Sequence, residues 1–212
     1  MKNRIKALFL SAVLLLCSCN SDNGGIDLMK AVELDNCSVH SVEFENPLSE
    51  STADIFRELL KNGSLTPVEA ENTVGGNGDY LEFFGENESY KISIRTSESD
   101  EKYLYAVSGN NEGFFTMDKE YMEDFSSELN RYAPKAFYGV IDTHISDNLY
   151  IVRPNGDTME SKSSDKIFIT SEIPFNEGDR VRVGYYGGIM ETYPAQINQL
   201  FIKGGSSVDD TD

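Results

Sequence analysis

Short segments that alternate apolar and polar residues, separated by turn sequences, dominate the C-terminal third of the chain. The turns "PNGD" at 154–157 and "NEGD" at 176–179 contain glycines that can adopt a positive φ. Alternation with a period of two places successive side chains on opposite faces of a strand. Residues 137–203 therefore predict an all-β, five-stranded, OB-like small barrel. Its expected strands are Phe137–Ile145, Leu149–Arg153, Ile167–Thr170, Arg180–Tyr186 and Gln199–Lys203.

The residues before this barrel, 28–133, predict a separate module that combines strands with two helices. In the first helix Ser51 is the expected N-cap and Gly63 supplies the stop. Asp118 is expected to cap the second helix, which Pro134 ends. Together with the strands, these helices predict an α+β module, an antiparallel sheet with two helices as cover. The expected strands are Cys37–Phe44, Tyr80–Phe84, Tyr90–Arg95, Tyr103–Val107 and Phe114–Met117.

The first residues have the pattern of a secretory signal. Three basic residues precede an apolar run at 7–16, and a polar stretch begins at Asn20. This run is too short for a membrane-spanning helix, which needs about 20 residues. We therefore expect residues 1–18 to be a cleaved signal peptide. The other expected boundaries are a flexible linker at 19–27 and an acidic disordered tail at 204–212.

The sequence Leu16-Cys17-Ser18-Cys19 resembles the lipobox of bacterial lipoproteins. Cys19 fits that motif because the small residue Ser18 precedes it, whereas Leu16 is too large for the position before Cys17. The resemblance implies cleavage between Ser18 and Cys19, a diacylglyceryl thioether on Cys19, and acylation of the new amino end by a fatty acid such as palmitate. Two or more acyl chains would hold the protein on the extracytoplasmic face of the cell membrane. The alternatives are an ordinary signal with incidental cysteines and a Cys-x-Cys redox or metal pair, which cleavage would separate.

The charge of the chain limits its partners. It carries 18 basic and 36 acidic residues, a net charge of −18. Removal of residues 1–18 would take away three basic residues and no acid, which leaves −21. No nucleic-acid partner is expected, because nucleic-acid binding depends largely on Lys and Arg contacts with phosphate. An anionic lipid surface is also repelled, so the lipid anchor would have to provide membrane attachment.

Three short sequences near the C-terminus carry a second resemblance. They are Ser163–Lys166, Gly178-Asp179 and, most specifically, Tyr193–Ile197 ("YPAQI"). With their spacing they resemble small OB-like domains at the C-terminus of uncharacterised lipoproteins of Gram-positive bacteria. The resemblance covers nearly all of residues 137–203 and none of residues 28–133. It implies the barrel and the envelope location, and it implies no activity.

Cys37 and His40 are the only thiol and imidazole that lie close together in the sequence. A nucleophile and base, or two metal ligands, would need to meet in space. Three residues apart on a strand, these side chains point to opposite faces. A half-buried structural histidine is therefore the favoured interpretation. After cleavage and acylation Cys37 would be the one free thiol, so no intramolecular disulfide is expected.

The remaining clusters lack the spacing of known sites, so no metal, cofactor or catalytic residue is predicted. Glu98–Glu101 and Asp209–Asp212 do not supply the ligand run of an EF-hand. Gly75–Gly78 has no following Lys-Ser/Thr pair, so it is no P-loop. No serine lies in G-x-S-x-G, although Asp142 and His144 share a strand face. Paired carboxylates stay open as an alternative, because 36 acids make chance pairs inevitable.

The segment around Pro194 contains the candidate ligand-binding residues Tyr193, Pro194 and Gln196. Pro194 fixes its own φ and keeps Tyr193 extended. Tyr193 could then stack on a glycan or peptide while Gln196 offers an amide. The alternative, which is favoured, is that the segment closes the end of the barrel and directs the last strand.

Two functional hypotheses follow from the sequence. The first is a non-catalytic binding or interaction module, anchored outside the membrane, whose partner is an envelope protein or glycan. The second is a carboxylate-dependent envelope hydrolase, which would require two carboxylates a few ångströms apart with a raised pKa on one of them. Only two histidines are present and no polar motif converges, so the first hypothesis is favoured.

Overall fold

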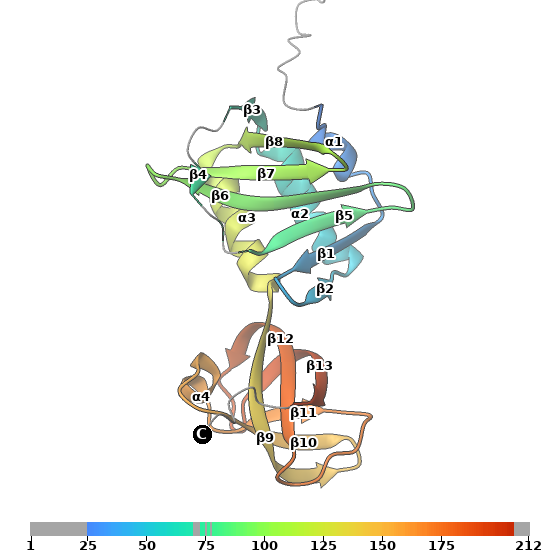
Figure 1. The fold of residues 1–212 in the computed structure, drawn as a ribbon, viewed down its shortest axis with the longest axis vertical. Coiled ribbons are helices and arrows are strands. Elements are labelled where there is room, and N and C mark those ends of the chain that lie inside the picture. Colours follow the sequence, from blue (N-terminus) through green and yellow to red (C-terminus); the bar gives the residue numbers. More distant parts are fainter. Residues whose placement is uncertain (1–24, 70–72, 75, 77, 206–212) are drawn as a thin grey trace, which may run out of the picture.

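The computed structural model describes residues 25–69, 73–74, 76 and 78–205. Within these residues the fold is mostly β, with two antiparallel sheets and four helices (Figure 1). Sheet A is formed by strands between residues 36 and 116, and sheet B by strands between residues 134 and 204. Each sheet has a separate hydrophobic core. The predicted antiparallel sheet in the first part of the chain and the predicted all-β character of the second part are thereby confirmed.

Sheet A contains eight strands. They are β1 Asn36–His40, β2 Glu45–Pro47, β3 Thr66–Val68, β4 Thr73–Val74, β5 Tyr80–Phe84, β6 Ser89–Ser97, β7 Lys102–Ser108 and β8 Asn111–Thr116. Seven follow the order β2-β1-β5-β6-β7-β8-β3, and β4 pairs with the end of β6. β6 therefore lies at the centre of the sheet, and β2 and β3 are its edges.

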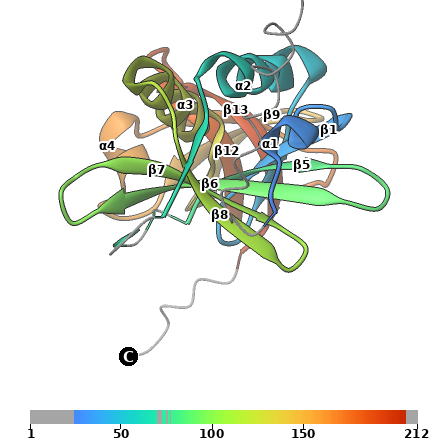
Figure 2. The same cartoon turned by 90° about the horizontal axis from the view of Figure 1, so that it is seen from above.

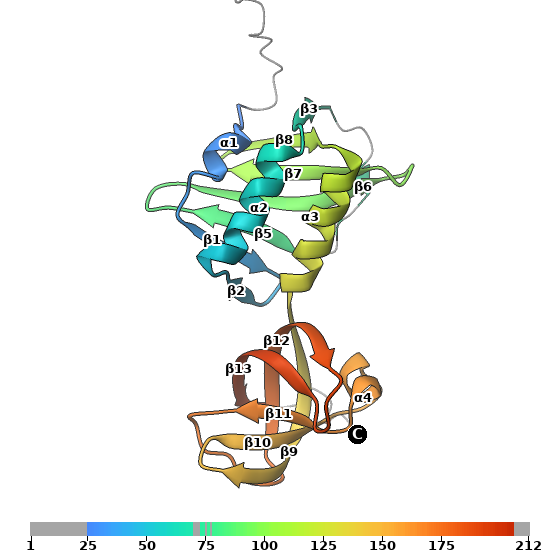
Figure 3. The same ribbon diagram turned by 180° about the vertical axis from the view of Figure 1, so that it is seen from behind.

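Two helices cover one face of sheet A, α2 (Glu50–Asn62) and α3 (Lys119–Tyr132), as Figure 3 shows. Each helix buries a stripe with helical spacing. The stripes consist of Ala53, Phe56 and Leu60 in α2 and of Met122, Phe125 and Leu129 in α3. Rings of Phe56 and Phe125 meet edge to face at 5.5 Å. The short helix α1 (Leu28–Ala31) buries Leu28 and Ala31 in the same core.

The ends of the helices correct part of the sequence interpretation. The N-cap of α2 is Ser49, whose side chain accepts a hydrogen bond from the Thr52 N–H at 3.3 Å. The prediction of Ser51 as the cap is wrong, because Ser51 already lies in the first turn. Gly63 is confirmed as the stop, with its N–H donating to the Leu59 carbonyl. Asp118 occupies the N-cap position of α3 without a side-chain hydrogen bond.

The strand predicted over Cys37–Phe44 is correct only as far as His40. Residues 41–44 form a tight turn, in which the Ser41 N–H donates to the Phe44 carbonyl at 2.9 Å. The chain then returns as β2 along β1. At the tip of this turn Val42 is 87% exposed. The sequence of the turn contains neither glycine nor proline, so it carries no turn signal.

Sheet B contains the five strands that the sequence predicts. They are β9 Pro134–Ser146, β10 Leu149–Pro154, β11 Ile167–Thr170, β12 Arg180–Met190 and β13 Gln196–Gly204. Their order is β11-β10-β9-β12-β13, and the sheet curls into a half-barrel. β11 has the predicted bounds. β9 begins three residues earlier than predicted, at Pro134, and so follows α3 directly.

A fourth helix, α4 (Met159–Ser163), lies between β10 and β11 and is absent from the sequence prediction. Its polar sequence offers no apolar stripe that would reveal it. Glu160 of α4 is buried and accepts a hydrogen bond from the Tyr185 hydroxyl at 2.7 Å. Burial and this hydrogen bond both raise the pKa of Tyr185. The pair satisfies two polar groups inside sheet B.

The two sheets contact each other through an arginine held between rings. The Arg182 guanidinium on β12 lies 4.6 Å from the centroid of Phe44 and 5.2 Å from that of Tyr138. It also forms an ion pair with Glu43 in the turn after β1. Phe44 in turn packs on Phe201 at 4.9 Å. We call Glu43, Phe44, Tyr138, Arg182 and Phe201 the Arg182 clamp.

The predicted signal peptide at 1–18, the lipobox from Leu16 to Cys19 and residues 206–212 of the predicted tail at 204–212 lie outside the described residues. The same holds for most of the predicted linker at 19–27. Gly204, the first residue of that predicted tail, belongs to β13 instead. Among the described helices, none has the length and apolar character needed to cross a membrane.

Candidate functional site

One face of sheet A carries none of the described helices, and we call it the open face. Seen from above in Figure 2, α2 and α3 both lie on one side of the sheet, and no described helix lies on the other side. Leu81, Ile92 and Leu104 point into the core beneath the helices and are fully buried. Their neighbours along each strand therefore point to the open face. Such a face is normally polar, and this one is rich in aromatic side chains.

Five directly opposed residues cross the open face in one line, from β1 to β8. They are His40, Tyr80, Ser93, Tyr105 and Phe114. We call them the aromatic row. The rings of His40 and Tyr80 stack at 4.7 Å with an angle of 2° between their planes. The rings of Tyr105 and Phe114 lie 4.9 Å apart. The row thus presents two aromatic pairs with the small Ser93 between them.

A hollow of about 180 Å³ lies between these two pairs, and we call it the β6 hollow. Lys91, Ser93 and Arg95 alternate along β6 and line it together with Tyr80 and Tyr105. Gly76 and Gly78, in the segment before β5, line it as well. Lys91 Nζ lies 5.2 Å from the Tyr80 ring centroid, and the Arg95 guanidinium lies 5.3 Å from that of Tyr105. Cation–π attraction therefore holds each cation against one ring. Of the described residues that line the hollow, only Lys91 and Arg95 are charged.

Two carboxylates lie on the open face outside the β6 hollow. Glu82 lies 3.1 Å from His40 Nε2 and 4.0 Å from Lys91 Nζ. Glu112 accepts a hydrogen bond from the Tyr105 hydroxyl, which raises the pKa of Tyr105. Across the described ranges Arg95 has no carboxylate at ion-pair distance. Its guanidinium is therefore the cation of the hollow that is most available to an anion.

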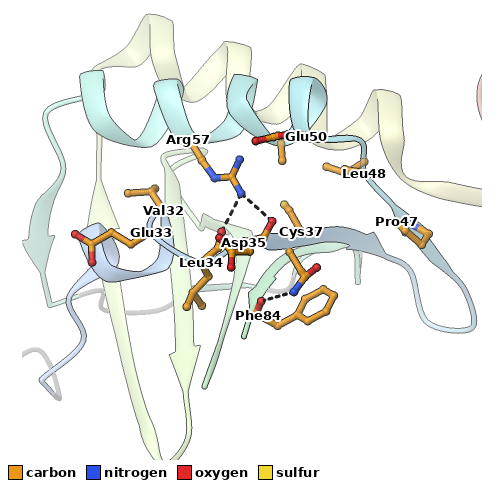
Figure 4. Close-up of a pocket in the computed structure, with 12 residues that line it drawn as sticks. Val32, Glu33, Leu34, Asp35, Cys37, Pro47, Leu48, Glu50, Arg57 and Phe84 are labelled. Atoms are coloured by element: carbon orange, nitrogen blue, oxygen red, sulfur yellow. Dashed lines mark hydrogen bonds between the residues drawn. The ribbon is translucent and has the colours of Figure 1, made fainter. Parts of the chain in front are cut away.

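A larger hollow, of about 560 Å³, lies between α2 and the segment that leads into β1 (Figure 4). Its one cation, Arg57, points toward this segment and donates to the carbonyls of Leu34 at 2.8 Å and Asp35 at 3.2 Å. Arg57 also pairs with Asp54 at 2.8 Å. Because these partners occupy its donors, Arg57 serves to tie α2 to the start of β1. This hollow therefore offers less to a ligand than the β6 hollow.

The structure separates Cys37 from His40, as the strand pattern predicts. Cys37 lies under the helices and is 5% exposed, whereas His40 lies on the open face. Burial raises the pKa of the Cys37 thiol to about 12, although the nearby Arg57 cation opposes this shift. A thiol that stays protonated is a poor nucleophile and a poor metal ligand. The pair is therefore no catalytic or metal site, and His40 belongs to the aromatic row.

Asp142 and His144 have different partners, although both lie on β9. Asp142 forms an ion pair with Lys166 at 3.1 Å, which raises the pKa of Lys166. His144 stacks on Tyr150 at 4.7 Å. The two residues therefore do not form the acid–histidine part of a triad.

The candidate residues Tyr193, Pro194 and Gln196 are only partly brought together. Tyr193 is 74% exposed, and Gln196 lines a shallow hollow of about 390 Å³ that Tyr193 does not reach. Ala195, between them, is buried. Its carbonyl accepts a hydrogen bond from the Phe168 N–H of β11, and its N–H donates to the carbonyl of Lys166, the residue before β11. The position of Ala195 matches the predicted structural role at the end of sheet B. Binding by Tyr193, Pro194 and Gln196 stays a prediction.

The described residues contain no group of three or more His, Cys, Asp or Glu arranged to hold a metal ion. Paired-carboxylate catalysis needs one acid with a raised pKa. Burial raises the pKa of Asp79, although Lys135 opposes this shift. Asp79 is not among the residues that line the β6 hollow or the larger hollow. Of the acidic clusters, Asp209–Asp212 lies outside the described residues.

Tyr80, Lys91, Arg95 and Tyr105, which build the β6 hollow, were not among the predicted site residues. One local signal was present in the sequence, because "KISIR" at 91–95 alternates two cations and a serine with two isoleucines. The period of two places those three polar residues on one face. Their tyrosine neighbours depend on strand register, which a local pattern does not supply.

Comparison with known proteins adds no relative. No protein-family model matches the chain, no curated protein matches its sequence, and no solved structure matches its fold.

Proposed function

We propose that this chain is a lipid-anchored extracytoplasmic lipoprotein that acts as a non-catalytic binding module, with the open face of sheet A as its binding surface. The observation that carries the proposal is the aromatic row, which occupies a sheet face that none of the described helices covers. Aromatic side chains give large contact areas at low entropic cost, and binding surfaces are enriched in them. The proposed partner is an envelope protein or glycan, in keeping with the proposed location. Nucleic acid is not proposed, because the net charge of −18 disfavours it.

The anchor in this proposal is Cys19, carried over from the lipobox resemblance. Asp27, which caps α1, follows Cys19 by eight residues, and eight residues span at most about 29 Å. α1 lies at the end of sheet A that is remote from sheet B (Figure 1). The anchor would therefore keep sheet A near the bilayer and direct sheet B away from it.

We also propose the finer description of the fold, an α+β domain at 28–133 followed by an OB-like barrel at 137–203. Closure of the barrel is supported by a parallel bridge between Ile167 and Ala195. The Gln199 amide adds two hydrogen bonds across the same gap, from the Thr170 N–H at 2.8 Å and to the Thr170 carbonyl at 2.6 Å. Slow hydrogen exchange at the Thr170 amide, lost in Gln199→Ala, would support a closed barrel.

Site-specific crosslinking in intact cells tests the binding function. A photo-crosslinking amino acid replaces Val107, which lines the β6 hollow on the open face. A matched control carries it at Glu123, a largely exposed position on the helix side of sheet A. We expect discrete adducts from position 107, their loss when Tyr105→Ala is added, and few adducts from position 123.

Three outcomes would each overturn part of the proposal. Equal adducts from both positions, or adducts that persist in Tyr105→Ala, would show that the open face is not the binding surface. Separately, membrane association and lipid labelling that survive Cys19→Ala would remove the anchor from the proposal.

A further inference from the structure

We infer that the β6 hollow binds one anion-bearing sugar unit of an envelope glycan, with the anion on Arg95 and Lys91. This inference rests on the proposed binding function and names its ligand class. The anion is a carboxylate or a phosphate ester, which share the chemistry that guanidinium and ammonium groups recognise.

The charged side chains that line the β6 hollow are positive, whereas the net charge of the chain is negative. Between residues 28 and 132 the chain has 8 basic and 22 acidic residues. Two of these eight, Lys91 and Arg95, line a single hollow, and the described residues that line it include no acid. Surfaces with one local sign of charge attract ligands of the other sign, and the attraction is strongest where solvent is partly excluded. An anion in the hollow would meet both cations at once.

The cations are held in place before a ligand arrives. The rings of Tyr80 and Tyr105 lie against Lys91 and Arg95, so binding would not have to order two long side chains. Ser93 lies between them on the same strand and offers a hydroxyl as a hydrogen-bond donor. Arg95, which lacks a carboxylate partner in the described part of the chain, provides the main contact.

The dimensions of the hollow favour a single sugar ring. Its volume of about 180 Å³ is below the range of about 300–1,000 Å³ that encloses a drug-sized molecule. Tyr80 and Tyr105 both lie opposite Ser93, so their backbones are about 9.5 Å apart, which is two strand spacings. A single pyranose ring suits a hollow of this size, and its charged and hydroxyl groups can reach the two cations.

An acidic peptide fits this position less well. Extended peptides usually bind by adding a strand to a free sheet edge. The β6 hollow lies on the central strand of sheet A, and β5 and β7 occupy both edges of β6. A peptide would therefore contribute only side chains there, whereas a terminal or branching sugar unit can enter from above.

Isothermal titration calorimetry on the full chain tests this inference with defined probes. The probes are a galacturonic acid trimer, the neutral galactose trimer, galactose 6-phosphate, and a tri-glutamate peptide. Concentrations reach roughly ten millimolar, because small shallow sites bind weakly. We expect one or both anionic sugars to bind, the neutral trimer to bind at least about tenfold more weakly, and added salt to weaken binding. The two anionic probes distinguish a carboxylate from a phosphate source.

Variants assign the binding to the hollow. Arg95→Gln and, separately, Lys91→Gln should each weaken binding of the anionic sugar by about tenfold, because each removes a charge-assisted hydrogen bond. Lys119→Gln removes the same charge from a side chain that is 90% exposed on α3, and it should leave binding unchanged. Circular dichroism checks that each variant is folded. If Arg95→Gln unfolds, the effect of Lys91→Gln and the comparison of charged with neutral probes test the inference instead.

Several results would overturn the inference while leaving the proposed function intact. These are equal binding of the neutral trimer, preferential binding of the peptide, no binding of any probe, and equal losses in Lys119→Gln and Lys91→Gln. In each case adducts from position 107 in intact cells would still identify the open face as the binding surface. Absence of those adducts is instead the failure of the proposed function.

Discussion

Cys37 is a single thiol enclosed between sheet A and its helices, and its environment decides its chemistry. Burial raises its pKa from 9.0 to about 12, so almost no thiolate exists near pH 8. Alkylation requires thiolate and access, so the folded protein should react with iodoacetamide about a thousandfold more slowly than the unfolded protein. Mass spectrometry of peptides from the full chain measures the alkylation rate of Cys37 separately from that of any other cysteine. Comparable rates in the two states would contradict the enclosed position.

The raised pKa of Cys37 also predicts how the free energy of unfolding changes with pH. Between about pH 9 and pH 12 the unfolded chain loses the Cys37 proton while the folded chain retains it. The free energy of unfolding should therefore fall as pH rises through this window, by at most about 1.4 kcal/mol per pH unit from this group. Cys37→Ala removes this contribution. Its unfolding free energy should depend less steeply on pH than that of the wild type.

Ser49, not Ser51, caps the start of helix α2, and the effects of removing each serine can be compared by experiment. The Ser49 side chain accepts the Thr52 N–H, whereas Ser51 lies in the first turn with an exposed side chain. Ser49→Ala should cost about 1 kcal/mol of stability, within the usual range of about 0.5–2 kcal/mol for a lost cap. Ser51→Ala is the matched control. It removes only an exposed contact of 3.1 Å between the Ser51 and Ser49 hydroxyls and should cost less than Ser49→Ala, since alanine is a better helix former. Urea denaturation measures both, and equal losses would contradict the assignment.

The elements that the sequence predicts well are those whose signals are local. Ile167–Thr170 is a short apolar run between polar segments, and its observed bounds are the predicted ones. Errors arise where two local signals compete or where none exists. Ser49 and Ser51 are both acceptable caps, and the turn at 41–44 has no glycine or proline. Helix α4 has no apolar stripe, and the edge strand β3 contains a proline, which disfavours a strand.

The candidate site depends on register, which explains why the sequence predicts only part of it. Alternation in β6 places Lys91, Ser93 and Arg95 on one face. It does not say that Tyr80 and Tyr105 are the residues opposite Ser93, because that pairing involves separate strands. A slip of one residue would turn those tyrosines into the core. The aromatic row is therefore a property of sheet A as a whole.

At the scale of the whole molecule, the Arg182 clamp is a polar link between the two sheets. Rings of Phe44 and Tyr138 hold the Arg182 guanidinium, and Glu43 pairs with it. A cation–π contact contributes about 0.5–1 kcal/mol at an exposed site and more where water is excluded. An ion pair with an exposed partner adds about 0–1 kcal/mol. The Glu43 side chain is 57% exposed, so we expect the rings to provide most of the stabilisation.

Arg182→Ala should therefore lower the free energy of unfolding by about 1–3 kcal/mol, since both ring contacts and the ion pair are lost. Arg182→Lys keeps the charge without the planar guanidinium and should recover less than half of this loss. Glu43→Gln should cost less than about 1 kcal/mol. Differential scanning calorimetry should also show that Arg182→Ala separates the melting of the two cores, because each sheet has its own core. If Glu43→Gln costs as much as Arg182→Ala, the ion pair rather than the rings joins the two sheets.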